Sequence, residues 1–381
     1  MTTRVKTKDG DLILDSHKLS WHMDRVHAWE NGERIAPISV DMALTRACGA
    51  MCSFCYAMVQ EAQERSQIKL EHLIRLLDDF KEIGIKSVSL ISDGESTISK
   101  SYVPFIEHAN SIGIDVGNAT NAWEWGAEKI DAVLPKLKWV RFTVAAGKPE
   151  SYAKIMYKGP EYTNVFEKAM KNIRYAVELK EKLKLDVTLG IQMVLMPEFK
   201  KEIIPFAKLA IDLGVDYGVI KHCSDDEEGT LGVNYDSYES MYSDLASAES
   251  LSNEKTKIIV KWEKIKDKGI PSYRRFYGPQ FLLQISGSGL VAPSGMFFNA
   301  KFSKFHIGNF TEQSFKDIFQ SNNYWRTMDY LASPYFDARN MMGTLPIQHY
   351  VSVALDNHIR GIDKLKASPN FDNPPLHVNF I

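Results

Sequence analysis

Cysteine is scarce in this chain of 381 residues, with four in total and none after Cys223. So few cysteines do not form a disulfide framework, and a reducing compartment would keep them available as ligands. Long hydrophobic runs are also missing. The N-terminus "MTTRVKTKDGDLIL" has no apolar core of a signal peptide, and no later run has the length of a membrane span. We therefore expect a cytoplasmic protein with no membrane partner.

An excess of charge of one sign is absent too. Lys and Arg total 46, Asp and Glu total 48, and the formal net charge is −2. Because the two signs are interspersed, no basic surface for nucleic acid is predicted. Hydrophobic residues make up 44% of the chain, which is enough for one large domain or two modest ones.

Short β-branched runs alternate with amphipathic stretches through the first part of the chain, which is typical of β/α units around a parallel sheet. The pattern predicts an α/β fold, a partial (β/α)6 barrel of the TIM type. The predicted strands are Pro37–Leu44, Lys86–Ile91, Ile114–Asn118, Trp139–Val144, Val187–Leu195 and Tyr217–Lys221. The predicted helices are Gln67–Ile83, which ends at Gly84 as a C-cap, Tyr102–Ser111, Tyr162–Leu183 and Lys200–Leu213.

The pattern changes after about Glu228, where no further clear βα repeat is visible. The stretch "LLQISGSGLVAPSGMFFNAKFSKFHIGNF" alternates apolar residues with Gly and Ser turns and predicts hairpin β. The ending "SPNFDNPPLHVNFI" is predicted to be irregular. We therefore divide the chain into an N-terminal extension (1–34), a barrel core (35–228) and a C-terminal region (229–381).

Three of the four cysteines lie in "LTRACGAMCSFCYA", directly after the first predicted strand: Cys48, Cys52 and Cys55. A structural zinc usually takes four protein ligands, so zinc here needs a remote histidine. An iron–sulfur cubane held by three cysteines leaves one iron open to a small molecule. Loops at the carboxyl ends of barrel strands build active sites. The spacing favours a catalytic cluster, and a non-catalytic zinc-binding protein is the alternative.

The C-x3-C-x2-C spacing, with the aromatic Phe54 before the last cysteine, closely resembles the radical S-adenosylmethionine (radical SAM) superfamily. The resemblance implies one [4Fe–4S] cluster on the three cysteines, Phe54 beside the cofactors, and SAM at the open iron. It implies reductive cleavage of SAM to a 5′-deoxyadenosyl radical, which takes a hydrogen atom from the substrate. An external electron donor such as flavodoxin or ferredoxin is the implied partner.

Further motifs carry the same resemblance. "SDGES" stands where the family commonly has Gly-Gly-Glu, which assigns Gly94 and Glu95 to the methionine amino group and leaves Asp93 in place of the first glycine. "GNATNAW" resembles a Thr-Asn-Gly pattern and implies that Asn118 and Asn121 face the site. In "VRFTVAAG" the resemblance places Thr143 at the ribose or the carboxylate of SAM, and in "LGIQMVLMPE" it places Gly190 and Gln192 near the adenine or the ribose.

The C-terminal region resembles a SPASM extension, through "ISGSGLVAPSG" and "IGNFTEQSFKDIFQSNNYW". Ser294 stands where the first auxiliary-cluster cysteine of such an extension usually lies, and no cysteine follows it. We expect a SPASM-like region without an auxiliary cluster. Because relatives are thought to pass a second electron to that cluster, its absence favours a redox-neutral reaction: epimerisation, elimination or rearrangement.

Three residues at the end of the sixth predicted strand are candidates for the chemistry on the substrate. Cys223 is a candidate hydrogen-atom donor, although free cysteine is more often a small buried side chain. Lys221 and His222 are candidate substrate contacts. Only about 34 residues precede the first strand, too few for a peptide-recognition module. We therefore favour a small polar substrate, a sugar, aminocyclitol or sugar nucleotide, over the alternative, maturation of a ribosomally made peptide.

Overall fold

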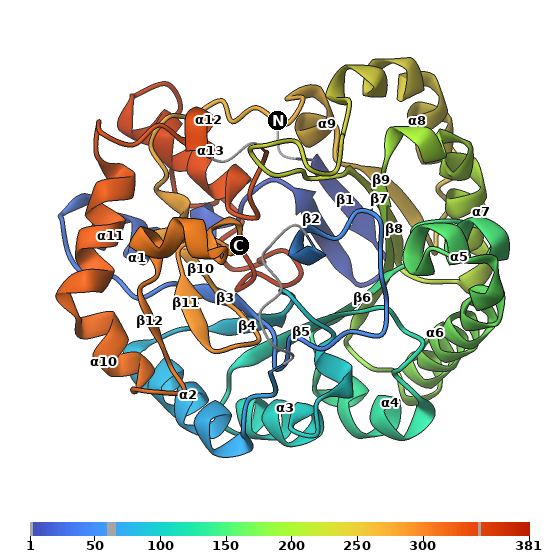
Figure 1. Cartoon of the computed structure of the whole chain (residues 1–381), viewed down its shortest axis with the longest axis horizontal. Helices are drawn as coiled ribbons and strands as arrows, with labels where there is room; N and C mark the ends of the chain where they lie inside the picture. The colour runs from blue at the N-terminus through green and yellow to red at the C-terminus, as the bar shows by residue number, and fades with distance from the viewer. Residues whose placement is uncertain (1–2, 59–65, 342–343) are drawn as a thin grey trace.

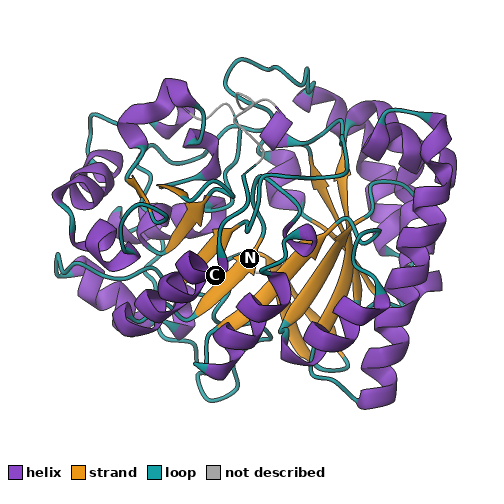
Figure 2. Cartoon of the chain, turned by 60° about the horizontal axis from the view of Figure 1, so that its bottom comes forward, coloured by secondary structure: helices purple, strands orange, loops and turns teal. Residues whose placement is uncertain are grey.

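The structure is a computed structural model that describes residues 3–58, 66–341 and 344–381. A ten-stranded sheet curves into an incomplete barrel, and helices cover its outer face (Figures 1 and 2). The strand order is β12-β11-β10-β3-β4-β5-β6-β7-β8-β9. Every neighbouring pair from β10 through β9 is parallel. The chain is therefore an α/β protein with a largely parallel sheet.

The six predicted core strands are confirmed, with ends shifted by a few residues. They are β3 (Ser39–Met42), β4 (Ser87–Leu90), β5 (Asp115–Thr120), β6 (Trp139–Thr143), β7 (Thr188–Leu195) and β8 (Tyr217–His222). All residues of β3, β4 and β7 are buried, as expected of parallel strands covered on both faces.

The four predicted helices of the core are confirmed as α2 (Leu70–Ile83), α3 (Tyr102–Ser111), α6 (Thr163–Leu183) and α7 (Ile203–Leu213). Helix α2 buries Leu73, Leu76, Leu77 and Phe80, one stripe at helical spacing, and ends at Gly84 in the left-handed conformation. Two shorter helices were not predicted, α4 (Ala127–Val133) and α5 (Pro149–Tyr157). They have 7 and 9 residues, which is short for an amphipathic repeat to be recognised in the sequence.

The C-terminal region does not stand apart from the barrel. Strands β9 (Lys257–Val260) and β10 (Leu282–Ile285) extend the parallel sheet at its two edges, beside β8 and β3. The parallel part of the sheet therefore has two more strands than the six that were predicted for the core. The predicted hairpin is confirmed, because β10 pairs antiparallel with β11 (Leu290–Ala292), which pairs with β12 (Gly308–Asn309). The remaining helices are α8 (Tyr242–Glu249), α9 (Trp262–Lys266), α10 (Phe315–Gln320), α11 (Asn322–Ala332), α12 (Ala338–Met341) and α13 (His349–Ile359).

Side chains, not strand pairing, bridge the gap between β9 and β10. The fully buried Gln348, just before α13, donates its Nε2 to the carbonyl oxygens of Leu282 in β10 (3.0 Å) and Pro293 (2.8 Å). On the other edge, Lys264 of α9 donates its Nζ to the carbonyl oxygen of Pro346 at 3.2 Å. The segment 346–348 therefore joins the two ends of the parallel sheet.

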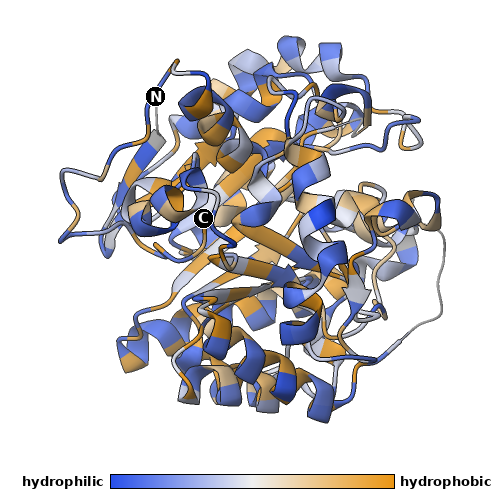
Figure 3. Ribbon diagram, turned by 90° about the vertical axis from the view of Figure 1, so that its left-hand side faces the viewer, coloured by the Kyte–Doolittle hydropathy of each residue, from blue (hydrophilic) through white to orange (hydrophobic). Residues whose placement is uncertain are grey.

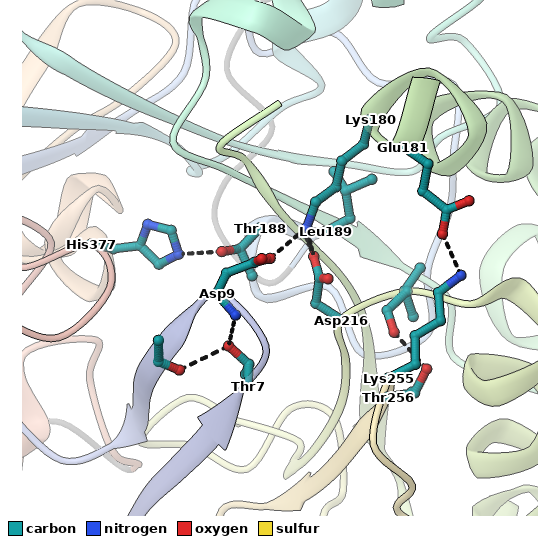
Figure 4. Close-up of polar contacts among 12 residues, drawn as sticks. Thr7, Asp9, Lys180, Glu181, Thr188, Leu189, Asp216, Lys255, Thr256 and His377 are labelled. Carbon is teal, nitrogen blue, oxygen red and sulfur yellow. Dashed lines mark hydrogen bonds and ion pairs between the residues drawn. The ribbon is translucent and has the colours of Figure 1, made fainter. Parts of the chain in front are cut away.

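The two chain ends close the opposite, N-terminal end of the barrel. The hairpin of β1 (Thr3–Thr7) and β2 (Gly10–Asp15) precedes α1 (Met23–Glu30). Figure 4 shows its turn residue Asp9 contacting Lys180 (3.1 Å), which also binds Asp216 (2.6 Å). The same view shows His377 bonded to Thr188 at 2.8 Å. As predicted, the ending of the chain, residues 368–381, contains no helix or strand.

Apolar residues concentrate in the strands and on the helix faces that cover them, and polar residues lie on the outer helix faces (Figure 3). One large core cluster runs from β3 to the helices α10 and α11, so the barrel and the C-terminal region share a core. Within the described part of the chain, no helix has both the length and the apolar character needed to cross a bilayer.

We predict that Gln348→Met lowers the free energy of unfolding by about 1–3 kcal/mol, because the buried carbonyl oxygens of Leu282 and Pro293 lose a donor. Urea denaturation of the metal-free protein measures the loss. The control is Gln320→Met on the exposed end of α10, which should change stability by less than about 0.5 kcal/mol. Equal effects of the two substitutions would contradict the bridging role of Gln348.

Candidate active site

The loop with three cysteines follows β3 and is held by backbone hydrogen bonds to two other segments. The amides of Met51 and Ser53 donate to the carbonyl oxygens of Met156 and Ile155 at the end of α5, both at 2.9 Å. The amide of Glu95, after β4, donates to the carbonyl oxygen of Ala47 at 2.9 Å. These bonds fix the path of the loop independently of any metal.

Asp93 ties three segments together beneath this loop. Its carboxylate pairs with the Arg46 guanidinium (3.1 Å) and accepts hydrogen bonds from the Ser286 hydroxyl (2.5 Å) and the Gly287 amide (2.7 Å). The Arg46 and Asp93 side chains are only 9% and 3% exposed. The departure from the family pattern at Asp93 therefore has a structural account: the carboxylate joins the loop after β3 to the loop after β10.

Gly94 is required by close packing at the same place. A Cβ atom on Gly94 would lie 1.9 Å from the carbonyl oxygen of Thr45, so only glycine fits here. The neighbouring Glu95 is 4% exposed. Its Oε1 accepts from the hydroxyl (2.6 Å) and amide (3.3 Å) of Thr97, and its Oε2 accepts from the Asn121 amide (2.8 Å). Burial raises the pKa of Glu95 while these hydrogen bonds lower it.

One pocket of about 330 Å³ lies at the carboxyl ends of the strands and gathers most of the predicted site residues. The predicted residues that line it are Cys48, Cys52, Phe54, Cys55, Gly94, Glu95, Asn121, Thr143, Gln192 and Lys221. They come from β3, β4, β5, β6, β7, β8 and the loops that follow them, which bring residues 173 positions apart to one cavity.

Four predicted site residues do not line this pocket. The amide of Asn118 is fully buried and has no hydrogen-bond partner among the described residues, and alternation along β5 places it on the face opposite Ala119. Gly190 lies against the ring of Tyr217, which a Cβ would approach to 2.2 Å. His222 and Cys223 are 1% and 0% exposed.

The surroundings of Cys223 are those of a small apolar side chain. It packs with Val194 and Met196, and its thiol lies 3.9 Å from the carbonyl oxygen of Phe54 and 3.5 Å from that of Ser224. Lys221 and Ser224, on either side of it along the chain, do reach the pocket. The hydrogen-donor role of Cys223 stays a prediction.

Several pocket residues were not predicted as contacts from the sequence: Arg141, Lys264, Gln284, Ser294 and the segment Thr344–Ile347. Arg141 stands two residues before Thr143, and alternation along a strand places both side chains on one face. The sequence alone could therefore have predicted Arg141 as a pocket residue. The others come from the C-terminal region, whose strands lacked a βα repeat. Ser294 is fully buried, and its hydroxyl donates to Gln284 Oε1 at 3.2 Å.

The three cysteines line one pocket, as the ligands of one iron–sulfur cluster must. Burial and the neighbouring thiols of Cys55 and Cys48 raise the pKa of Cys52. In a cubane each of three thiolates binds a different iron, and the remaining iron is left open to a small molecule. These residues therefore fit a [4Fe–4S] cluster.

Comparisons with known proteins agree with this site. Residues 42–210 match the radical SAM superfamily. A 95-residue stretch is 27% identical to the sporulation killing factor maturation protein SkfB of Bacillus subtilis, and the match covers 25% of this chain and only 23% of SkfB.

Two solved structures share the fold. SuiB of Streptococcus suis, bound to its precursor peptide SuiA, has a TM-score of 0.60 and 15% identity, over 80% of this chain and 69% of SuiB. The enzyme anSMEcpe with bound AdoMet has a TM-score of 0.58 and 13% identity, over 88% of this chain and 99% of anSMEcpe. At such identities the likeness concerns the fold.

We predict that Asp93→Asn lowers the free energy of unfolding by about 3–5 kcal/mol, because Arg46 is left buried without its counter-charge. Urea denaturation of the metal-free protein measures this loss. The control is Asp212→Asn, which breaks a surface pair with Arg174 (64% and 44% exposed) and should cost about 0–1 kcal/mol. A loss at Asp93 as small as that at Asp212 would show that the buried pair does not hold the loop.

We also predict that the triple substitution of Cys48, Cys52 and Cys55 by Ala abolishes iron binding. Among the described residues, these are the cysteines that line the pocket, so the variant has no thiolate there to bind iron. Iron and sulfide are measured after anaerobic reconstitution. Cys223→Ala is the matched control and should keep the iron content of the unmodified protein. Iron retained by the triple variant, or lost equally in Cys223→Ala, would contradict the assignment.

Proposed function

We propose that this chain, a radical SAM enzyme whose family domain includes residues 42–210, removes a hydrogen atom from a peptide group that enters the barrel pocket. The observation that carries the proposal is a single pocket that joins the three clustered cysteines to the ends of β4 through β8. The substrate must therefore approach the cofactors from inside the barrel.

The cofactors of this superfamily are a [4Fe–4S] cluster and SAM. When bound, they supply a 5′-deoxyadenosyl radical that takes a hydrogen atom from the substrate. In our proposal Cys48, Cys52 and Cys55 hold the cluster, and Phe54 covers it. Gly94 and Glu95 orient the methionine amino group.

Two pocket residues remain for the nucleoside. Thr143 on β6 and Gln192 on β7 are paired in the strand register and both line the pocket. A hydroxyl and a carboxamide side by side offer donors and acceptors to a ribose or an adenine. Asn121, whose amide binds Glu95, has a buried Oδ1 without a hydrogen-bond partner among the described residues. That orphaned acceptor fits a donor on the bound SAM.

The peptide class of substrate is supported by the proteins that this chain resembles. SkfB is named as a maturation protein for a killing factor, and structures of SuiB and anSMEcpe contain bound peptides. A second candidate is a small polar metabolite, such as a sugar, aminocyclitol or sugar nucleotide. The basic pocket residues Arg141, Lys221 and Lys264 favour it, because they suit a polar or anionic ligand.

A redox-neutral outcome forms part of the proposal. The sequence has no cysteine after Cys223 that could hold an auxiliary cluster, which in relatives is thought to accept an electron from the substrate. In an epimerisation the substrate loses one hydrogen atom and regains one from a donor group. An external reductant then supplies one electron to cleave SAM and one electron, with a proton, to restore the donor. Cys223 is the proposed donor, although its thiol must first become accessible from the pocket.

We predict that reconstituted enzyme with SAM and dithionite releases 5′-deoxyadenosine faster when a substrate peptide is added, and that the product made in D2O gains one deuterium. Mass spectrometry of the nucleoside and of the product measures both. Panels of peptides, sugar nucleotides and aminocyclitols are compared, since stimulation by the small molecules alone would favour the second candidate.

The variant Cys223→Ser tests the donor separately. Loss of the deuterated product with 5′-deoxyadenosine release retained would support Cys223 as the donor. Unchanged turnover to the same product would remove that role. A product that has lost two hydrogen atoms would contradict the redox-neutral part of the proposal.

A further inference from the structure

Four basic side chains meet at the floor of the pocket, on the side that carries β6, β8 and β9. Arg141 lies on β6, Lys221 on β8, Lys261 directly after β9 and Lys264 in α9. Arg141, Lys221 and Lys264 line the pocket, and Arg141, Lys261 and Lys264 line a second cavity of about 130 Å³ beneath it. The four residues, named here the basic floor, therefore separate the two cavities.

None of the four forms an ion pair within 4.0 Å among the described residues. Lys264 reaches only the Pro346 carbonyl oxygen, at 3.2 Å, and lies with Lys261 over the ring of Tyr350. The buried Nε of Arg141 has no hydrogen-bond partner in the described part of the chain. Lys264 is buried, and Arg141, Lys221 and Lys261 are half-buried. Basic groups without an ion pair are rare at such burial, because burial of an uncompensated charge is costly.

Two carboxyl groups face the basic floor. Asp15 of β2 accepts a hydrogen bond from the Tyr350 hydroxyl. Burial raises the pKa of Asp41 on β3 to about 7, so it is partly protonated near neutral pH. Burial and repulsion among the basic groups lower the pKa of Lys221 to about 7 and that of Lys261 to about 8, and they lower the pKa of Lys264 well below its usual range. The four basic groups outnumber the two carboxyl groups, and a bound anion would favour their charged forms.

SAM carries a carboxylate of its own, for which Thr143 is one candidate contact, so an anion at the basic floor would bind in addition to SAM. The proposed methionine and nucleoside contacts come from the loops after β4 and β5 and from β6 and β7. Lys261 and Lys264 lie instead at the β9 edge, outside residues 42–210, and Lys261 opens on the lower cavity. An anion bound by Lys261 and Lys264 would lie deeper in the barrel than the cysteine loop does.

We propose that the basic floor binds an oxyanion of the substrate, a carboxylate or a phosphate, and so anchors the substrate for hydrogen abstraction in the pocket above. This inference rests on the proposed function, because it assumes that the pocket is where substrate reacts. A peptide would present an acidic side chain or its terminal carboxylate. A phosphorylated metabolite would present its phosphate.

The test uses the reconstituted enzyme with SAM bound, titrated with inorganic phosphate or with acetate at constant ionic strength. Isothermal titration calorimetry measures binding, and the thermal unfolding midpoint gives a second readout. We expect saturable binding of at least one anion. Lys264→Met should weaken it by about tenfold or more, because a charge-assisted hydrogen bond is lost. The matched control is Lys266→Met, an exposed lysine on the same helix, which should bind as the unmodified enzyme does.

The outcomes separate the possible anions and the two proposals. Tighter binding of phosphate supports a phosphate-bearing substrate, and acetate binding of equal or greater strength supports a carboxylate. Binding of neither anion, or equal weakening by Lys264→Met and Lys266→Met, overturns the inference. Should Lys264→Met fail to fold, Lys261→Met replaces it. Dithionite-driven SAM cleavage is measured on the same sample, so an enzyme that cleaves SAM but binds no anion refutes only the basic floor.

Discussion

The buried contact of Asp93 with Arg46 and with Ser286–Gly287 is the constraint on which the site depends. It fastens the loop after β3, which carries the cysteines, to the loop after β10, which comes from the C-terminal region. The close approach of Gly94 to Thr45 leaves no room for a side chain between the two loops. The cysteines are thus positioned by the protein before any metal binds, and the C-terminal region helps to position them.

The C-terminal region has a second role, because it completes the walls of the pocket. Strands β9 and β10 extend the sheet, and the segment around Gln348 joins their edges. Lys264, Gln284 and Ser294 then face the same cavity as Cys52 and Glu95. In our proposal this region contributes contacts to the substrate. The basic floor follows from the same closure, since Lys261 and Lys264 stand at the β9 edge.

The sequence predicted what depends on local pattern. The strands from β3 to β8 and the helix ending at Gly84 follow from periodicity and a C-cap, and the cysteine loop follows from ligand spacing. Strand β9 and the parallel pairing of β10 with β3 were not predicted, because β9 is short and β10 pairs with a strand distant in sequence. Asn118 and Gly190 were assigned to the site by motif, yet the face of β5 and the ring of Tyr217 place them outside the pocket. Such outcomes depend on tertiary contacts that no local pattern encodes.

The central claim is that Cys48, Cys52 and Cys55 hold a cluster with one iron open to SAM. Electron paramagnetic resonance of the anaerobically reconstituted, dithionite-reduced protein tests it most directly. The account predicts the signal of a reduced [4Fe–4S] cluster whose shape changes when SAM is added. A fully loaded cluster whose spectrum does not respond to SAM, or a colourless protein that retains only zinc, would contradict it.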